Sequence, residues 1–455
     1  MKIFFDKISF SSFLYAFNSC ISRKVPESVL MEAFQNPIPT ISLLKRLHFI
    51  CPCELNPSLL IPYVQLFPMD LSLSHMASSS FSSNSMKSLV FVTDWHPNVL
   101  STTTVGNNNE GAVMYIGPDS IALVQHLIDP LSNYISCLFK GKTVENLNIL
   151  DFCSGSGIQA ISALALTEYC FQHETKTANI DSFIIPRVMS ATCFDINERA
   201  LRFIQFNACI NGFTSQKDIF TCKANLLLEK DRKNIVQKWG NKSHIILANP
   251  PFIPVPRINT STMLSSEVSN DREISKNILK RYGLFSSGGP DGENVLREII
   301  SLTPRLLDSS TCGILAIVSE FMNPSNSTGL MKRMKLWHQV YLDNTTDGMA
   351  TMEGILFTNE FTISSLKYAL RRANDEEEYE LWCDHMNQLG IEDISPGLLF
   401  LQTEFVGQNL LKNDNGWRVE HILVPKSNLG SIWTPHNKYA VQFTSKEWKD
   451  RIMKK

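Results

Sequence analysis

The sequence predicts an α/β fold with a doubly wound, mostly parallel sheet at its centre. Between Leu147 and Phe321, short apolar runs alternate with stretches of helical periodicity, which is the pattern of successive βαβ units. A turn that contains two glycines follows the first apolar run and opens the first of the helices. These two observations predict a Rossmann-like domain whose ligands bind at the carboxyl ends of the strands.

The strands and helices of this domain are expected in a definite order. The expected strands are residues 147–150, 191–194, 245–248 and 313–318. The first helix starts at Gly157, and the second runs from Glu198 to Ile210. Gly212 follows the second helix, where glycine commonly ends a helix.

The regions on either side of this domain have a different composition. Residues 1 to about 75 contain short helical pieces, such as residues 41–47 behind Thr40, and residues 89–93 are expected to form a strand. A serine tract over residues 78–85 is interpreted as a solvated insertion. We therefore expect three parts: an amino-terminal, mostly helical substrate-recognition domain with polar insertions (1–110), the Rossmann-like domain (111–329), and a mixed carboxyl-terminal extension that completes or flanks the sheet (330–455).

The composition excludes several classes of protein. The chain has 455 residues, of which 44% are hydrophobic and 19% charged, and its 42 Lys and Arg against 44 Asp and Glu give a net charge of −2. These values fit a folded globular protein and argue against one that coats nucleic acid along its whole length. No apolar stretch reaches the roughly 18–20 residues of a membrane-spanning helix. We expect a cytoplasmic protein without a membrane partner, with a mitochondrial or other organellar location as the alternative because the first 24 residues are poor in acids.

The eleven cysteines favour reduced thiols over disulfides. Their number is odd, no CxxC pair occurs, and several lie in apolar stretches. The segment Cys51-Pro52-Cys53 has no second pair of ligands near it, so we interpret it as a loop and expect no metal. Residues 374–393 carry eight acids and no Lys or Arg, which is typical of a solvated helix face.

The glycine-containing turn is the first candidate ligand site. It reads Asp151-Phe152-Cys153-Ser154-Gly155-Ser156-Gly157. Gly155 and Gly157 have no Cβ, so the chain can turn tightly while a ligand lies against the backbone. A plain strand-to-helix turn has the same sequence requirements and is the alternative.

Asp195 is the second candidate. It follows the second expected strand, where a carboxylate can hold both hydroxyls of a ribose. Alternatively, Asp195 could cap the helix that begins near Asn197, and both interpretations can hold at once.

These two segments resemble the first and second motifs of class I S-adenosylmethionine-dependent methyltransferases. The resemblance implies an S-adenosyl-L-methionine site, and it places the cofactor on the following residues: Asp151, Cys153, Ser154, Gly155, Gly157, Asp195, Ile196, Asn225 and Asn249. Cys153 stands where the family usually has glycine, so we expect the turn there to be wider or less strained. Asn225 stands near the position of an acid that binds the adenine amino group, and its side-chain oxygen can accept the same hydrogen bond.

The segment Asn249-Pro250-Pro251-Phe252 carries the expected catalytic residues. It directly follows a predicted strand and resembles the NPP(Y/F) motif of methyltransferases that modify planar amide or amine nitrogens. The lone pair of such a nitrogen is delocalised, so two acceptors that grip its N–H bonds would aim it at the methyl group and stabilise the developing positive charge. We assign these acceptors to the Asn249 side-chain oxygen and the Pro250 carbonyl, and we expect Phe252 to stack on the acceptor.

Two further segments resemble a group related to protein-glutamine methyltransferases. Residues 115–120 are similar to the segment that covers the cofactor in that group. Residues 284–292 are similar to the glycine-rich turn that follows its NPPY motif, although a flexible turn explains them equally well.

These residues do not identify the substrate that accepts the methyl group. We favour a glutamine side chain of a protein, such as a translation-associated one. The alternatives are a base in RNA, of the ribosomal guanine-N2 or adenine-N6 type, or in DNA, and a non-catalytic cofactor-binding partner subunit. Residues 216–281 carry 12 Lys and Arg against 6 Asp and Glu, which could attract RNA or simply form a solvated rim.

Overall fold

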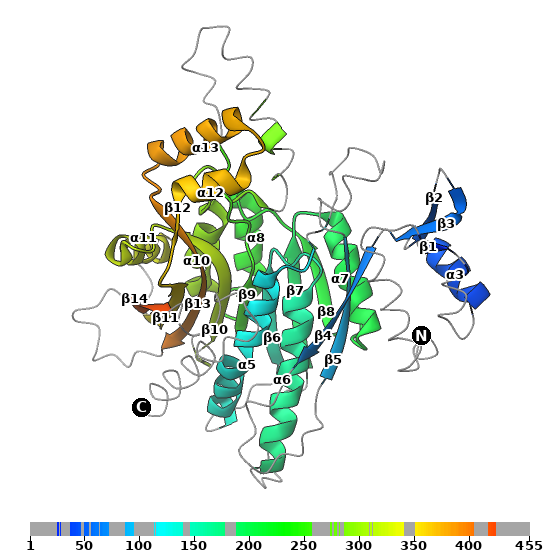
Figure 1. The fold of residues 1–455 in the computed structure, drawn as a ribbon. Coiled ribbons are helices and arrows are strands. Elements are labelled where there is room, and N and C mark those ends of the chain that lie inside the picture. Colours follow the sequence, from blue (N-terminus) through cyan, green and yellow to red (C-terminus); the bar gives the residue numbers. More distant parts are fainter. Residues whose placement is uncertain are drawn as a thin grey trace.

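The fold is seen in a computed structural model (Figure 1). The structure describes the following residues: 25–26, 28, 37–46, 50–53, 56–62, 64–71, 87–94, 113, 115–139, 146–177, 188–256, 274, 277–279, 282, 286–308, 310–311, 313–340, 351–404 and 417–424. The serine tract and the acid-poor first 24 residues lie outside this set.

One large sheet organises the described part of the chain. From one edge to the other, its strands are β14 (Trp417–Val424), β11 (Thr351–Asn359), β13 (Asp393–Glu404), β10 (Ile314–Met322), β9 (Ile245–Ala248), β6 (Asn146–Phe152), β7 (Val188–Asp195) and β8 (Ile219–Lys223), with β12 (Ile363–Ser364) paired to β13. The five strands from β6 to β10 are parallel, whereas β13 is antiparallel to both of its main neighbours. The predicted α/β fold with a mostly parallel sheet is confirmed.

The strand order reverses beside β6. The chain first adds β7 and β8 on one side of β6, and it then returns to add β9 and β10 on the other side. In doubly wound sheets the crevice at such a reversal, outside the carboxyl ends of the strands, is where ligands bind. The site is therefore expected between the ends of β6 and β9.

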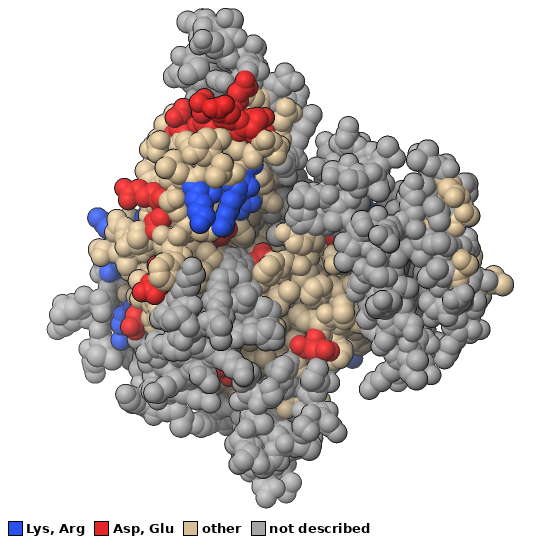
Figure 2. All heavy atoms as spheres, in the orientation of Figure 1, with Lys and Arg blue, Asp and Glu red and all other residues tan. Residues whose placement is uncertain are grey.

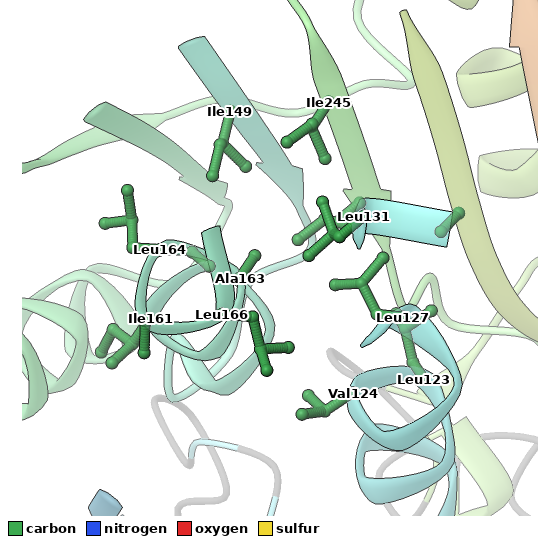
Figure 3. Close-up of a cluster of buried hydrophobic side chains, with 14 of the residues drawn as sticks. Leu123, Val124, Leu127, Leu131, Ile149, Ile161, Ala163, Leu164, Leu166 and Ile245 are labelled. Carbon is green, nitrogen blue, oxygen red and sulfur yellow. The ribbon is translucent and has the colours of Figure 1, made fainter. Parts of the chain in front are cut away.

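Helices cover both faces of the sheet. One face carries α5 (Pro118–Phe139), α6 (Ile158–Thr177) and α7 (Glu198–Ile210), and the other carries α8 (Glu229–Trp239), α10 (Asn294–Leu306) and α11 (Ser327–Gln339). Alternate strand residues belong to opposite cores, because successive side chains of a strand point to opposite faces. Figure 3 shows the first core, where Leu127 of α5 and Leu164 of α6 lie among residues that include Ile149 and Ile245 of the sheet.

The amino-terminal region differs from the predicted mostly helical structure. Its described residues include the helix α3 (Pro37–Arg46) and the strands β1 (Val25–Pro26), β2 (Ile50–Cys53), β3 (Asn56–Pro62), β4 (Val64–Leu71) and β5 (Lys87–Asp94). The prediction of a mostly helical region is wrong for these residues, and Thr40 lies inside α3 rather than at its start. Burial in β4 alternates mainly with a period of two, which fits a strand. The strand expected at 89–93 is confirmed by β5.

Described residues after 330 contribute four strands of the sheet, β11 to β14, and two further helices. The helices are α12 (Ser365–Arg372) and α13 (Glu376–Gln388). Figure 2 shows acidic side chains gathered over α13 and basic ones over the neighbouring α12, and most acids of α13 are solvent-exposed. Among the described helices, none has the length and apolarity needed to cross a lipid bilayer.

Candidate active site

A cavity of about 190 Å³ opens at the strand reversal. Its wall contains residues from the glycine turn, from the ends of β7 and β9, and from the segment before α5. The lining residues include Val113, Tyr115, Ser120, Cys153, Ser154, Gly155, Ser156, Asp195, Ile196, Asn225, Leu227, Asn249, Pro251 and Ser287. The structure thus brings most of the predicted site residues together around one space.

The glycine turn has three residues in the left-handed region. Their φ angles are +58° at Cys153, +53° at Gly155 and +81° at Gly157. The expectation that Cys153 makes the turn wider or less strained is therefore wrong. The cysteine adopts the conformation that glycine would adopt, at a cost of roughly 1–2 kcal/mol for an L residue.

The two glycines are needed for different reasons. A Cβ on Gly157 would lie 3.1 Å from the Ile204 side chain of α7, so this position serves packing between the turn and a helix. A Cβ on Gly155 would meet no atom within 4 Å and would instead enter the cavity. Gly155 therefore keeps space free for a ligand, which fits the predicted cofactor site.

Asp195 ties the end of β7 to the glycine turn. Its Oδ2 accepts a hydrogen bond of 2.9 Å from the Gly155 N–H, and its Oδ1 accepts one of 2.9 Å from the Asn197 N–H. Asn197, rather than Asp195, caps α7 by accepting from the Arg199 N–H. Burial raises the pKa of Asp195, and each carboxylate oxygen retains a lone pair for a ligand hydroxyl.

Ile196, Asn225 and Leu227 all line the cavity. Ile196 is 41% exposed and Leu227 is 49% exposed, so two apolar side chains of the wall are accessible. The Asn225 side-chain oxygen accepts from the Leu227 N–H at 3.0 Å, and one lone pair stays available. A flat apolar ring with an amino group fits these surroundings.

Asp151 lies beneath the cavity and does not line it. Its side chain is completely buried, and the described residues give neither carboxyl oxygen a well-formed hydrogen bond. Burial raises the pKa of Asp151 to about 8, only partly offset by Ser154 and the Ala160 backbone. A positively charged group placed beside this carboxyl would stabilise its ionised form and lower its pKa.

Asn249 is held by two side chains from the start of α5. Its Nδ2 donates hydrogen bonds to Asp119 Oδ2 at 2.8 Å and to Ser120 Oγ at 3.1 Å. Both amide hydrogens are thereby used, which fixes the orientation of the amide and leaves Oδ1 as an acceptor. Burial raises the pKa of Asp119, whereas the bond from Asn249 favours its charged form.

The diproline segment is supported by the glycine-rich turn. Ile253 and Ser287 form a parallel bridge, and the Gly288 N–H donates to the Ile253 carbonyl at 3.0 Å. A Cβ on Gly292 would lie 2.5 Å from the Phe252 carbonyl oxygen, so the close approach requires glycine. The part of this turn before residue 286 lies outside the described residues.

The predicted catalytic residues do not all reach the cavity. Asn249 and Pro251 line it, whereas Pro250 is buried and Phe252 is half-buried against a separate core cluster that includes Tyr368 and Trp382. The structure therefore does not place the Phe252 ring on the cavity wall.

Sequence reasoning missed a polar cluster near Asp119, the carboxyl that holds Asn249. Glu320 lies near the carboxyl end of β10 and accepts a hydrogen bond of 2.6 Å from Tyr368 of α12. Arg372 donates to the Tyr368 hydroxyl at 3.1 Å, and its guanidinium lies over the rings of Tyr368 and Tyr282. The acid at the carboxyl end of a predicted strand was the available signal for Glu320; the α12 residues gave none.

The chain is similar to known proteins in structure and not in sequence. No protein family profile and no curated protein sequence matches the chain. Solved structures do match: a type I restriction-modification methyltransferase subunit from Streptococcus thermophilus has 13% identity and a TM-score of 0.36, with 75% of this chain and 54% of that chain covered. An RNA methyltransferase candidate from Pyrococcus horikoshii has 8% identity and a TM-score of 0.28, with 62% and 81% covered.

A third solved structure contains the product form of the cofactor. It is a geranyl diphosphate C-methyltransferase from Streptomyces coelicolor A3(2) in complex with S-adenosyl-L-homocysteine, with 9% identity, a TM-score of 0.25, and 60% and 74% of the two chains covered. This chain spans about half the length of the Streptococcus subunit. All three similar structures are methyltransferases, and their substrates differ.

Proposed function

We propose that this protein is an S-adenosyl-L-methionine-dependent N-methyltransferase acting on a planar amide or amine nitrogen. The observation that carries the proposal is that Gly155 and Asn249 line the same cavity at the strand reversal. The first leaves space for a cofactor, and the second presents an amide oxygen whose orientation is fixed. A cofactor site alone would not need the second feature.

The cofactor side of the cavity matches the parts of S-adenosyl-L-methionine. Asp195 would accept from the ribose hydroxyls, and Asn225 from the adenine amino group beside Ile196 and Leu227. The carboxyl of Asp151, beneath the turn, would favour the positively charged amino group of the methionine part. When bound, the cofactor supplies an electrophilic methyl group.

The acceptor side would hold the nitrogen. The Asn249 Oδ1 would accept one N–H bond of the nitrogen and so help to turn its lone pair toward the methyl group. The same oxygen would stabilise the positive charge that develops on the nitrogen. Asp119 supports this by keeping the Asn249 amide in one orientation. The Pro250 carbonyl, the second acceptor expected from the sequence, belongs to a buried residue that does not line the cavity.

For the acceptor we propose a glutamine side chain of a protein. The isoleucine and proline after Phe252 and the Gly-Gly-x-Asp-Gly turn support this choice, because both are similar to the glutamine-modifying group. The alternative, a base in RNA or DNA, is favoured by the excess of Lys and Arg over residues 216–281. A non-catalytic partner subunit would have no use for the fixed Asn249 amide.

Two measurements test the function. Calorimetry with sinefungin, a cofactor analogue, should show binding to the full chain. The purified chain and tritiated S-adenosyl-L-methionine are then added to extracts of cells that lack this chain. A macromolecule in the extract should become labelled, and the label should survive nuclease and be lost to protease. Loss of the label to nuclease would instead support the nucleic-acid alternative, and absence of sinefungin binding would contradict the proposal as a whole.

A further inference from the structure

We infer that Asn207 of α7 is a positioning residue that couples the docking of the β4–β5 hairpin to the cofactor turn, and this inference rests on the proposed function. The Asn207 side chain is completely buried. Its Nδ2 donates to the Ser156 carbonyl at 2.8 Å and to the Val92 carbonyl at 2.9 Å, and its Oδ1 accepts from the Val92 N–H at 2.7 Å. One amide thus joins β5 to the cofactor turn.

A second asparagine repeats the contact with β5 one helical turn later. Asn211 Oδ1 accepts from the Val90 N–H at 2.9 Å, and its Nδ2 donates to the Val90 carbonyl at 2.7 Å. Four helical residues rise about 6.0 Å, and two strand residues span about 6.8 Å. Because these spacings nearly match, α7 presents side-chain amides to β5 much as a neighbouring strand would present its backbone.

The hairpin is fixed from both of its faces. Phe91 of β5 is completely buried in the core that contains α6, and Val92 is 1% exposed in a separate cluster that contains Ala200 and Phe203 of α7. Figure 1 shows β4 and β5 running beside α6 and α7. The hairpin therefore cannot shift without disturbing helices that border the cavity.

Asp94, at the end of β5, provides a second link to the cavity. Its carboxylate forms a two-pronged ion pair with Arg199 of α7, with distances of 2.6 and 3.0 Å. Asp94 Oδ2 also accepts from the Val113 N–H at 2.7 Å. Val113 and Ser156 both line the cavity, so β5 is joined to its wall directly through Asp94 and indirectly through Asn207.

These bonds make cofactor binding and hairpin docking interdependent. If a bound cofactor orders Ser156, it also orders the Asn207 amide and hence β5. Linkage requires the converse, so a docked hairpin must strengthen cofactor binding by the same factor. Cofactor binding would then stabilise the docked β4–β5 hairpin, although the strands of this hairpin do not line the cavity.

Hydrogen exchange of the full chain tests this coupling without any substitution. Saturating sinefungin should slow exchange of the Val90 and Val92 amides by about 5-fold or more. Unchanged exchange of both amides, with binding verified by calorimetry, would overturn the inference and leave the proposed function intact. Failure of sinefungin to bind would overturn both.

Two matched variants give an independent test. Asn207→Ala and Asn211→Ala each remove two bonds to β5, but only the first also releases Ser156. We expect both to lower the melting temperature, and only Asn207→Ala to weaken sinefungin binding, by about 5- to 20-fold. Equal affinities in the two variants would show a purely structural role and contradict the inference.

Discussion

The two sides of the cavity are built differently. On the cofactor side, the turn from 151 to 157 and the segment from 195 to 197 are bonded largely through backbone groups, and short stretches of sequence supply most of the wall. On the acceptor side, Asn249 is oriented by Asp119, 130 residues away in the chain, and Glu320 is bonded to Tyr368, 48 residues away. The cofactor side joins two consecutive strand-to-helix turns, 40 residues apart at the bond between Asp195 and Gly155, whereas the orientation of Asn249 depends on a residue 130 positions away.

Both sides of the cavity hold carboxyls whose pKa is raised by burial: Asp151 and Asp195 on the cofactor side, and Asp119 and Glu320 on the acceptor side. The acceptor side also holds a guanidinium. Arg372 is the cation bonded into this cluster, and it faces Glu320 at 3.7 Å. In the proposed transfer, an ionised Asp119 or Glu320 would stabilise the positive charge that develops on the nitrogen.

The largest effect should come from the acceptor side. Asn249→Ala removes the oxygen that grips the nitrogen, so we expect kcat to fall by roughly 10²–10³-fold while sinefungin affinity is unchanged. Labelled methyl transfer and calorimetry measure the two quantities. Asn148→Ala is the matched control, because Asn148 bonds to Lys242 at the other end of the strands. Equal activity of Asn249→Ala and the parent would contradict the proposal that Asn249 binds the acceptor nitrogen.

Removal of Asp119, the hydrogen-bond partner of Asn249, should lower kcat almost as strongly. Asp119→Ala deprives Asn249 of a charged hydrogen-bond partner, and such bonds contribute about 1.5–3 kcal/mol, so kcat should fall by roughly 10–100-fold. Ser120→Ala should have a smaller effect because its bond to Asn249 is neutral. A larger loss in Ser120→Ala than in Asp119→Ala would contradict the proposed orientation of the amide.

On the cofactor side, affinity rather than kcat should change. Asp195→Ala removes the acceptor of the Gly155 N–H and of the ribose, so sinefungin should bind roughly 10–100-fold more weakly. Asp218→Ala, which removes a carboxylate that holds the exposed loop after α7, should leave the affinity unchanged. Calorimetry compares the two variants. A change in kcat at saturating cofactor, with normal affinity, would assign Asp195 to the acceptor side instead.

The buried carboxyl beneath the turn should make stability depend on pH. In the unfolded chain Asp151 ionises near its ordinary pKa, whereas in the folded protein it keeps its proton up to a pKa of about 8. Its contribution to stability is therefore fully present below pH 4, falls as the pH rises to about 8, and stays constant above that. Asp151→Asn should raise the melting temperature at pH 8 by on the order of 5 °C and leave it unchanged at pH 4. A difference in melting temperature between parent and variant that is the same at pH 4 and pH 8 would contradict the raised pKa of Asp151.

The smallest effect should come from the strained cysteine. Cys153→Gly removes the side chain from a left-handed position, so the free energy of unfolding should rise by about 1 kcal/mol. Cys209→Gly is the control, because Cys209 lies in the helix α7, where glycine is unfavourable. Calorimetry should show a higher melting temperature for the first variant and a lower one for the second. A lower melting temperature for Cys153→Gly would mean that packing outweighs strain.

The same contrast explains what the sequence could predict. The helix of residues 198–210 and the strand of residues 245–248 match α7 and β9, because periodicity and end signals are local. The direction of the Asn249 amide could not be predicted, since it depends on Asp119. The strands of residues 50–71 were missed because prolines and short runs hide their period. The strain at Cys153 was missed because a residue type does not state its φ angle.

One feature of the sheet bears on how the protein assembles. Each strand from β7 to β10 joins an edge that earlier strands have already formed, whereas β13 must enter between β10 and β11, which precede it in the chain. During synthesis β11 emerges while its final neighbour is still missing, and the edge of β10 stays open to wrong pairing. The half of the sheet that carries the glycine turn should therefore form first, and insertion of β13 should be the slow step.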